Sequence, residues 1–224
     1  MGMKLVREGA AAVASALLVF GILAGAPVPA KAAEAVGMST HEESNRSAIK
    51  YSMRILWAEH VIWTRAYIVA AMSRSPDAPD VSSRLLRNQA DIGEAFAPYY
   101  GKEAGAKLAE LLKQHILLAA EVVKAVDPGD DKKFRAADKR WHENADDIAV
   151  FLSGINPNWS KKEILDMFND HLALTTKEAV SRFEKKWPDD ISAFDEIFRQ
   201  MMMMADDLSD GIIKQFPKKF KEAS

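Results

Sequence analysis

Apolar residues recur at helical spacing along nearly the whole chain from about residue 46, and this pattern leaves few folds open. No segment alternates apolar and polar residues with the period of two that marks a β-strand. Turn-forming residues divide the pattern into predicted helices at about 46–73, 81–97, 102–126, 131–153, 161–186 and 188–216. The sequence therefore predicts an all-α, single-domain bundle of about six helices, arranged as repeated αα-hairpins.

Local signals mark several of the helix ends. The segment Pro98-Tyr99-Tyr100-Gly101 is typical of a turn between the second and third helices. Ser160 and Glu163 have the spacing of a capping box at the start of the fifth helix. Pro188 suits the first turn of the sixth helix, where its missing N–H costs nothing.

The N-terminal residues have the three parts of a secretory signal peptide. Lys4 and Arg7 precede an uncharged, mostly apolar run over residues 10–26, and small residues follow around 30–33. We expect an exported protein, with residues 1–32 as signal peptide cleaved near residue 30–32. The alternative is a retained membrane anchor, although the run is at the short limit for spanning a bilayer. Residues 33–45 are predicted as a linker, 46–216 as the helical domain and 217–224 as a basic tail.

Composition excludes several classes of site. The chain has no cysteine, which rules out disulfides, thiolate metal sites and cysteine nucleophiles. The formal net charge is −2 and the pI is about 6.2, so we expect no nucleic-acid partner. No Gly-rich phosphate loop, His-Glu-x-x-His motif or Gly-x-Ser-x-Gly elbow is present.

Three histidines suggest an internal repeat. His60, His115 and His171 are separated by 55 and 56 residues, and each lies on the apolar stripe of an odd-numbered helix. The even-numbered helices carry a related phrase, which is Ala-Asp-Ile at 90–92, Ala-Asp-Asp-Ile at 145–148 and Ala-Asp-Asp-Leu at 205–208. We expect all three histidines to be buried, because the stripe of a helix faces the core.

Two interpretations of these histidines remain open. In the first, imidazoles and carboxylates form a divalent-metal or small-ligand site, for which Zn, Cu or Fe are suitable ions. Its candidate ligands are His60, His115, His171, Asp91, Asp147, Glu178 and Asp207. In the second, each ring bonds to an Asp of the partner helix or to a hydroxyl such as Thr64 or Thr175, and the role is structural.

These alternatives lead to three functional hypotheses. The first is an exported, non-enzymatic binding protein with an interior metal or ligand site. The second is a structural or partner-binding helical protein with purely structural His–Asp pairs. The third is a metal-dependent enzyme, which requires an open coordination position. Arg65, beside His60, is expected to form a salt bridge with Glu59 or another carboxylate, with anion binding as the alternative.

Several phrases are similar to those of a known group of proteins. They are Leu56–Arg65, Asn144–Ala149, Ile155–Ser160 and His171–Thr175. Together they resemble an uncharacterised family of small all-helical bacterial proteins, whose members sometimes carry the labels glycosyltransferase or acetylglutamate kinase. The resemblance spans most of residues 47–213. It implies a shared helical fold and carries over no catalytic residue.

Overall fold

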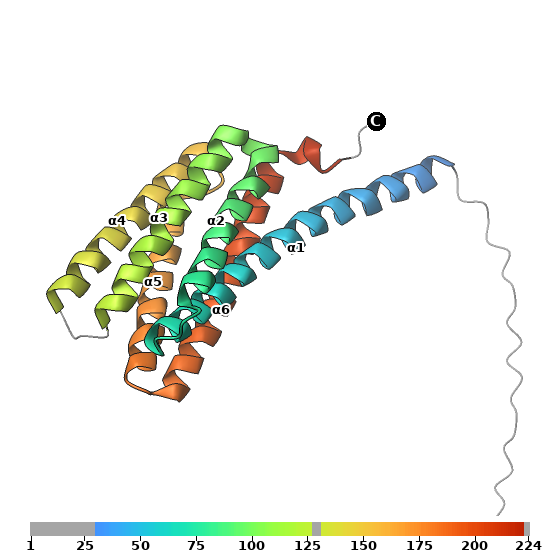
Figure 1. Cartoon of the computed structure of the whole chain (residues 1–224). Helices are drawn as coiled ribbons and strands as arrows, with labels where there is room; N and C mark the ends of the chain where they lie inside the picture. The colour runs from blue at the N-terminus through green and yellow to red at the C-terminus, as the bar shows by residue number, and fades with distance from the viewer. Residues whose placement is uncertain (1–29, 127–130, 222–224) are drawn as a thin grey trace, which may run out of the picture.

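The computed structural model describes residues 30–126 and 131–221, and helices account for most of these residues (Figure 1). They are α1 (Ala30–Met72), α2 (Ala78–Tyr100), α3 (Lys102–Val126), α4 (Asp131–Ile155), α5 (Lys161–Phe183) and α6 (Trp187–Gln215), followed by the 3-10 turn η1 (Pro217–Lys219). No strand occurs within the described ranges. The predicted all-α bundle of about six helices is confirmed. The expected signal peptide lies almost entirely outside these ranges.

Two of the predicted helix starts have the expected chemistry. The Ser160 hydroxyl accepts a hydrogen bond from the backbone N–H of Glu163, with 3.4 Å between the two atoms. This bond satisfies one of the N–H groups that the first turn of α5 cannot pair internally. Pro188 is the second residue of α6, where its fixed φ suits the first helical turn.

The predicted turn at 98–101 is wrong in part, because α2 continues through Pro98 and ends only at Tyr100. A proline in the last turn of a helix removes one backbone donor and leaves the remaining bonds in place. The N–H of Gly101 still bonds to the carbonyl of Ala97, 3.0 Å away. Gly101 then ends the helix with a φ of +89°, a conformation that favours glycine.

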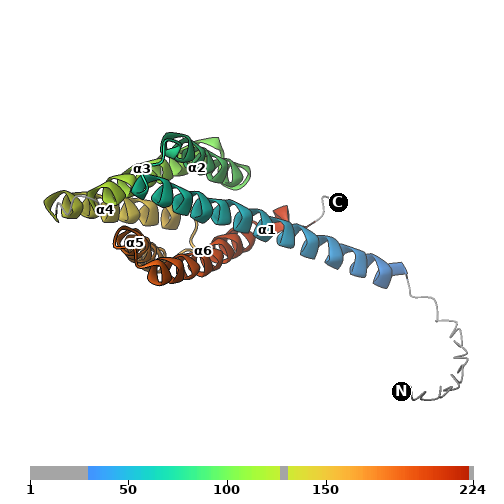
Figure 2. The ribbon, with the colours of Figure 1, turned by 60° about the horizontal axis from the view of Figure 1, so that its bottom comes forward.

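Helix α1 is longer than the sequence pattern predicted. It begins at Ala30, so residues 33–45, the expected linker, continue the same helix. Four of the first six residues of this helix, 30–35, are alanine, which is the strongest helix former. Its N-terminal part projects beyond the other helices (Figures 1 and 2). None of the described helices is both long and apolar enough to cross a membrane.

The six helices form a closed ring. Each even-numbered helix packs against the helix before it and the one after it, and α6 returns to α1. The odd-numbered helices α1, α3 and α5 also contact one another. By these contacts they form an inner triangle, with α2, α4 and α6 outside it. The predicted stripe of each odd-numbered helix points to the centre of this triangle.

The start of the predicted basic tail packs against the bundle. Phe220 is buried and stacks on Tyr99, with their ring centroids 5.9 Å apart. The Nζ atom of Lys219 donates to the carbonyl of Pro98 at 2.7 Å. The chain thus remains attached to the end of α2 after α6 has ended.

The crossing of α2 and α3 depends on two glycines. A Cβ atom on Gly93 would lie 2.4 Å from the carbonyl oxygen of Gly105 and 2.8 Å from the Cβ of Ala109. A Cβ on Gly105 would lie 2.5 Å from the carbonyl oxygen of Gly93. These distances are too short for any side chain, so the two backbones touch directly.

We predict that Gly93→Ala lowers the free energy of unfolding by about 1–3 kcal/mol, because it forces α2 and α3 apart. Gly154→Ala is the matched control, since Gly154 is also helical and a Cβ there would meet nothing within 4 Å. Urea unfolding followed by far-UV circular dichroism measures both variants. Equal stability of the two would contradict the close approach.

Candidate functional site

The three predicted histidines meet at the centre of the bundle. His60 of α1, His115 of α3 and His171 of α5 are 2%, 2% and 4% exposed. Ring centroids are 5.9 Å apart for His60 and His171, and 6.3 Å apart for His115 and His171. The predicted burial is confirmed, and these three side chains are called the histidine cluster below.

Both ring nitrogens of His115 are engaged. The indole N–H of Trp141 donates to Nε2 at 3.1 Å, so this nitrogen carries the lone pair. The other nitrogen, Nδ1, therefore carries the proton and donates to the side-chain oxygen of Asn144 at 2.9 Å. The amide group of Asn144 in turn donates to the carbonyl of Leu111 at 3.1 Å. His115 is held as one neutral tautomer.

A related contact occurs in the other two helical hairpins. The side chains of Asn88 and Gln200 donate to the carbonyls of Leu56 and Met167, at 3.0 and 2.8 Å. These carbonyls, like that of Leu111, lie four residues before a histidine of the cluster. Each even-numbered helix is thus attached to its odd-numbered partner one turn before the histidine.

The environments of His60 and His171 are less complete than that of His115. The amide nitrogen of Gln89 lies 3.3 Å from Nδ1 of His60. Among the described residues, Nδ1 of His171 and the hydroxyl of Thr175 have no hydrogen-bond partner. The hydroxyl of Thr64 bonds to the backbone carbonyl of His60 and not to its ring. The ring partners are therefore amides and an indole, and neither predicted hydroxyl bonds to a ring.

The predicted aspartates lie away from the histidine cluster. Asp91, Asp147 and Asp207 are all on the solvent-exposed faces of their helices. Asp91 follows Gln89 by two residues, and two residues turn a helix by about 200°, to the opposite face. The same phrases point their apolar residues Ile148 and Leu208 inward.

Glu178 belongs to a separate ionic network between α1, α5 and α6. Its carboxylate is 2.5 Å from Nη1 of Arg65, and the same guanidinium binds Asp190 through contacts of 2.8 and 3.0 Å. Arg182 adds a contact of 3.2 Å to Asp190. Burial raises the pKa of Glu178 to about 7, against the opposing effect of Arg65. Arg65 thus has the predicted salt bridge, whereas Glu59 pairs with Arg84.

Asp190 and Arg182 were not predicted from the sequence as members of this network. Asp190 lies in the first turn of α6, where an acidic residue is common and is usually solvated. It is instead 1% exposed, because the turn between α5 and α6 places it against Arg65. A pairing over 125 residues of chain leaves no local signal.

The described residues contain no group of three or more His, Asp and Glu side chains placed to hold a metal ion. Within the histidine cluster, His115 is not free to bind a metal ion, because both of its ring nitrogens are hydrogen-bonded and a ligand needs a free imidazole lone pair. The geometry at His115 fits a structural role, with an amide and an indole as partners in place of the predicted aspartate or hydroxyl.

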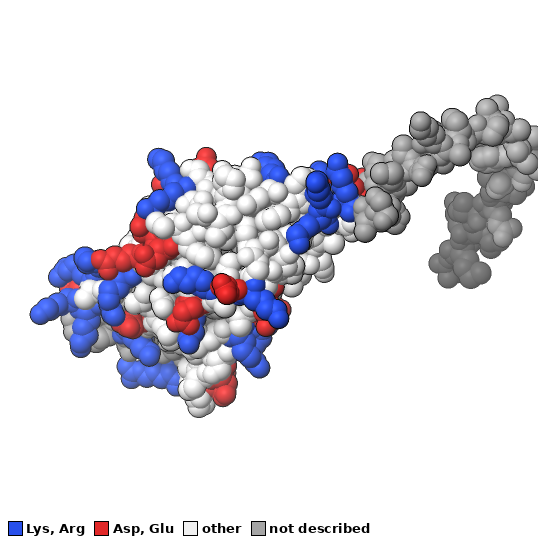
Figure 3. Space-filling view, turned by 90° about the horizontal axis from the view of Figure 1, so that it is seen from above, with Lys and Arg blue, Asp and Glu red and all other residues white. Residues whose placement is uncertain are grey.

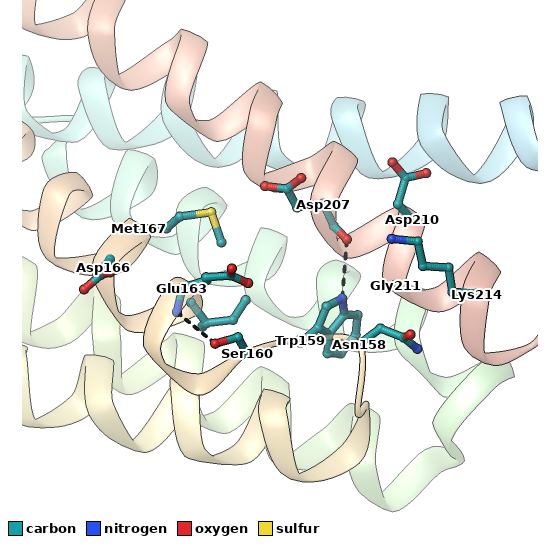
Figure 4. Close-up of a pocket in the computed structure, with 11 residues that line it drawn as sticks. Asn158, Trp159, Ser160, Glu163, Asp166, Met167, Asp207, Asp210, Gly211 and Lys214 are labelled. Atoms are coloured by element: carbon teal, nitrogen blue, oxygen red, sulfur yellow. Dashed lines mark hydrogen bonds between the residues drawn. The ribbon is translucent and has the colours of Figure 1, made fainter.

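A second candidate site lies on the surface between α6 and the start of α5. This pocket has a volume of about 500 Å³ and is called the α5–α6 pocket below. Figure 4 shows Trp159 of the α4–α5 loop lying against α6, with its indole nitrogen directed at the backbone of Asp207. The pocket is lined by Asn158, Trp159, Ser160, Glu163, Ile164, Asp166, Met167, Asp207, Asp210, Gly211 and Lys214.

The backbone at Gly211 allows Trp159 to form one wall of this pocket. A Cβ at Gly211 would lie 1.9 Å from Nε1 of Trp159, so only glycine fits there. The indole N–H donates to the backbone carbonyl of Asp207 at 3.4 Å. The loop predicted to end at the Ser160 cap is thereby fixed against α6, which brings Glu163 near Asp207.

Carboxylates outnumber cations around the α5–α6 pocket. Asp166 pairs with Lys162 at 2.6 Å and Asp210 with Lys50 at 2.7 Å. Within the described part of the chain, neither Glu163 nor Asp207 has a Lys or Arg within ion-pair distance. Partial burial raises the pKa of Asp207, its neighbours Asp210, Asp206 and Glu163 add to this effect, and Lys214 of the same pocket opposes it.

The chain was compared with family models, curated proteins and solved structures. No family model, curated protein or solved structure matches the chain.

We predict that Trp141→Phe lowers the free energy of unfolding by about 1–3 kcal/mol, because it leaves Nε2 of His115 buried without a donor. Trp187→Phe is the control, since Trp187 is 46% exposed. Urea unfolding at pH 7.5 compares the two. If Trp141→Phe is as stable as its control, the indole bond does not support His115.

We also predict that Zn²⁺, Cu²⁺ and chelator leave the melting temperature unchanged at pH 7.5. A site that binds only in the folded state would add about 2.7 kcal/mol at a hundredfold excess over Kd. Calorimetry of protein purified without an affinity tag makes this comparison. A rise in melting temperature that His60→Ala and His171→Ala each abolish would support the metal hypothesis instead.

Proposed function

We propose that this chain is an exported, non-enzymatic binding protein and that the α5–α6 pocket takes a small organic cation. The observation that carries the proposal is the pair of carboxylates, Glu163 and Asp207, that lie in one pocket without an ion-pair partner. An ammonium group between them would offset the negative charge of Glu163 and the neighbouring aspartates, which adds to the effect of burial in raising the pKa of Asp207. Trp159 and Met167 offer apolar contact to the rest of such a ligand.

The proposed export depends on the N-terminal pattern of charge, apolar run and small residues. The resemblance to the family of small helical bacterial proteins is part of the same proposal. Binding is assigned to the pocket and no reaction is assigned to it. The mixture of Lys and Arg with Asp and Glu over the surface in Figure 3 is consistent with a small ligand in preference to nucleic acid.

The interior supports a further element of this proposal, namely that the hairpins α1–α2, α3–α4 and α5–α6 are copies of one unit. Each histidine is followed after 29 residues by an amide residue, which is Gln89, Asn144 or Gln200. In each hairpin an amide side chain bonds to the carbonyl four residues before the histidine. Under this proposal the histidine cluster specifies how the copies join, and a metal or ligand is not needed there.

A partner-binding role is the second candidate, and one observation favours it. Tyr51, Ile55 and Ile62 are 68%, 43% and 49% exposed. Their spacing places them on the same face of α1, opposite the face that packs into the bundle. An apolar face of this kind is suited to contact with another helix.

The cation proposal is tested by titrating the full chain with 1,4-diaminobutane and tetramethylammonium while following amide NMR signals. We predict saturable shifts at residues of the α5–α6 pocket, which weaken with added salt. Glu163→Gln and Asp207→Asn should each raise Kd roughly two- to fivefold, because an exposed ion pair contributes less than about 1 kcal/mol.

Asp91→Asn is the matched control, because Asp91 is an exposed carboxylate on α2 outside the pocket. Acetate serves as the control ligand of opposite charge. Linear, non-saturating shifts, or equal Kd values in the pocket and control variants, would remove the support for this function.

A further inference from the structure

The histidine cluster lies where the three inner helices meet, and its rings come from all three of them. Each of α1, α3 and α5 contacts the other two, and each contributes one ring that is at least 96% buried. His171 lies beside both of the others, at centroid distances of 5.9 and 6.3 Å. A change in charge at these rings therefore acts on the whole junction at once.

Among the residues that the structure describes, no carboxylate offsets charge within the cluster. The neighbouring groups are amides, indoles and a phenyl ring from the five helices other than α3: Trp57 of α1, Gln89 of α2, Trp141 and Asn144 of α4, Phe168 of α5 and Gln200 of α6. The titratable groups that act on the rings are the histidines themselves and His142 of α4. The ionic network of Glu178, Arg65 and Asp190 begins two turns along α5 from His171, and Glu59, which pairs with Arg84, is next to His60 in the sequence.

The hydrogen bonds at His115 require a neutral ring. A proton on Nε2 would place an N–H group opposite the indole N–H of Trp141, so two donors would face each other. A second proton in the cluster would add repulsion between rings about 6 Å apart. Protonation of His115 thus breaks its buried hydrogen bond to Trp141, and protonation of more than one ring adds repulsion between the rings.

We propose that the histidine cluster is an acid-sensitive lock, which holds the three inner helices together near neutral pH and opens the bundle cooperatively in mild acid. The lock needs no ligand and acts independently of the α5–α6 pocket. Opening exposes the core between α1, α3 and α5.

The direction of the titration is consistent with this lock. Burial, first of all, lowers the pKa of His60 to about 4 and that of His115 to about 3, and it holds that of His171 well below 6.5. In the unfolded chain these groups return to about 6.5. Between those values the unfolded state binds more protons, so stability is complete above pH 6.5 and falls as the pH is lowered.

Glu178 acts in the opposite direction. Its pKa of about 7 in the folded protein exceeds the ordinary value of 4.5, so it binds a proton before the unfolded chain does. Stability from this group therefore increases as the pH falls from about 7 towards 4.5. The raised pKa of Asp207 acts in the same direction as that of Glu178. Between the histidine cluster and Glu178, three histidines oppose one glutamate, and the unfolded state gains a net of about two protons.

The test measures the unfolding equilibrium constant of the full chain by urea titration from pH 7.5 to 5. In wild type the constant should rise about 100-fold per pH unit below pH 6, because two net protons are taken up. Glu178→Gln should steepen this dependence to about 1,000-fold. Replacing His60 or His171 with Gln should lower the pH dependence from about 100-fold to about tenfold per pH unit. His142→Gln is the control at a half-buried surface position and should leave the wild-type dependence unchanged.

A second measurement needs no folded variant of the cluster. Imidazole C–H signals of wild type should show three histidines that do not titrate between pH 7.5 and 5 in the folded state. Three histidines that titrate near pH 6.5 in the folded protein would overturn the proposal. A wild-type dependence below tenfold per pH unit, or one that His142→Gln reduces as much as His60→Gln does, would also overturn it.

Discussion

The hydrogen bonds of Asn144 connect α4 to α3 and fix the tautomer of His115. Its amide donates to the backbone of α3 while its oxygen accepts from His115. A carboxylate in this place could not donate to the carbonyl of Leu111, and a hydrophobic side chain could do neither. Because Trp141 completes the same ring from the adjacent turn of α4, the junction of α3 and α4 has one hydrogen-bonding arrangement that leaves no polar atom of His115 unpaired.

This arrangement constrains the other inner helices. The rings of His115 and His171 lie close together, so the position of α5 depends on the ring that Asn144 and Trp141 hold. Within the described ranges, Nδ1 of His171 has no hydrogen-bond partner, and neither has the hydroxyl of Thr175. The cluster is thus well satisfied on the α3–α4 side and poorly satisfied on the α5 side. The hydrogen bonds that stabilise the cluster are therefore concentrated in the α3–α4 hairpin.

The helices and the burial of the histidines could be predicted from the sequence, because both depend on the spacing of apolar residues within a short stretch of chain. It was insufficient for the ring partners, since an amide and an aspartate two residues apart are equally near in sequence but point to opposite faces. Gln89 and Asp91 illustrate this point. The α5–α6 pocket was beyond sequence reasoning, because Glu163 and Asp207 meet only after Trp159 packs on Gly211.

The closure of the ring between α1 and α6 has a consequence for the order of folding. Arg65 and Asp190 are 125 residues apart, and Arg54 and Asp206 are 152 apart. Contacts of such separation form late, because a long loop must first be closed. A chain that emerges N-terminus first exposes one face of α1 until α6 has been made. Helix α1 is therefore the last to acquire its second neighbour, and Asp190 of α6 is the last member of the network around Arg65 to be synthesised.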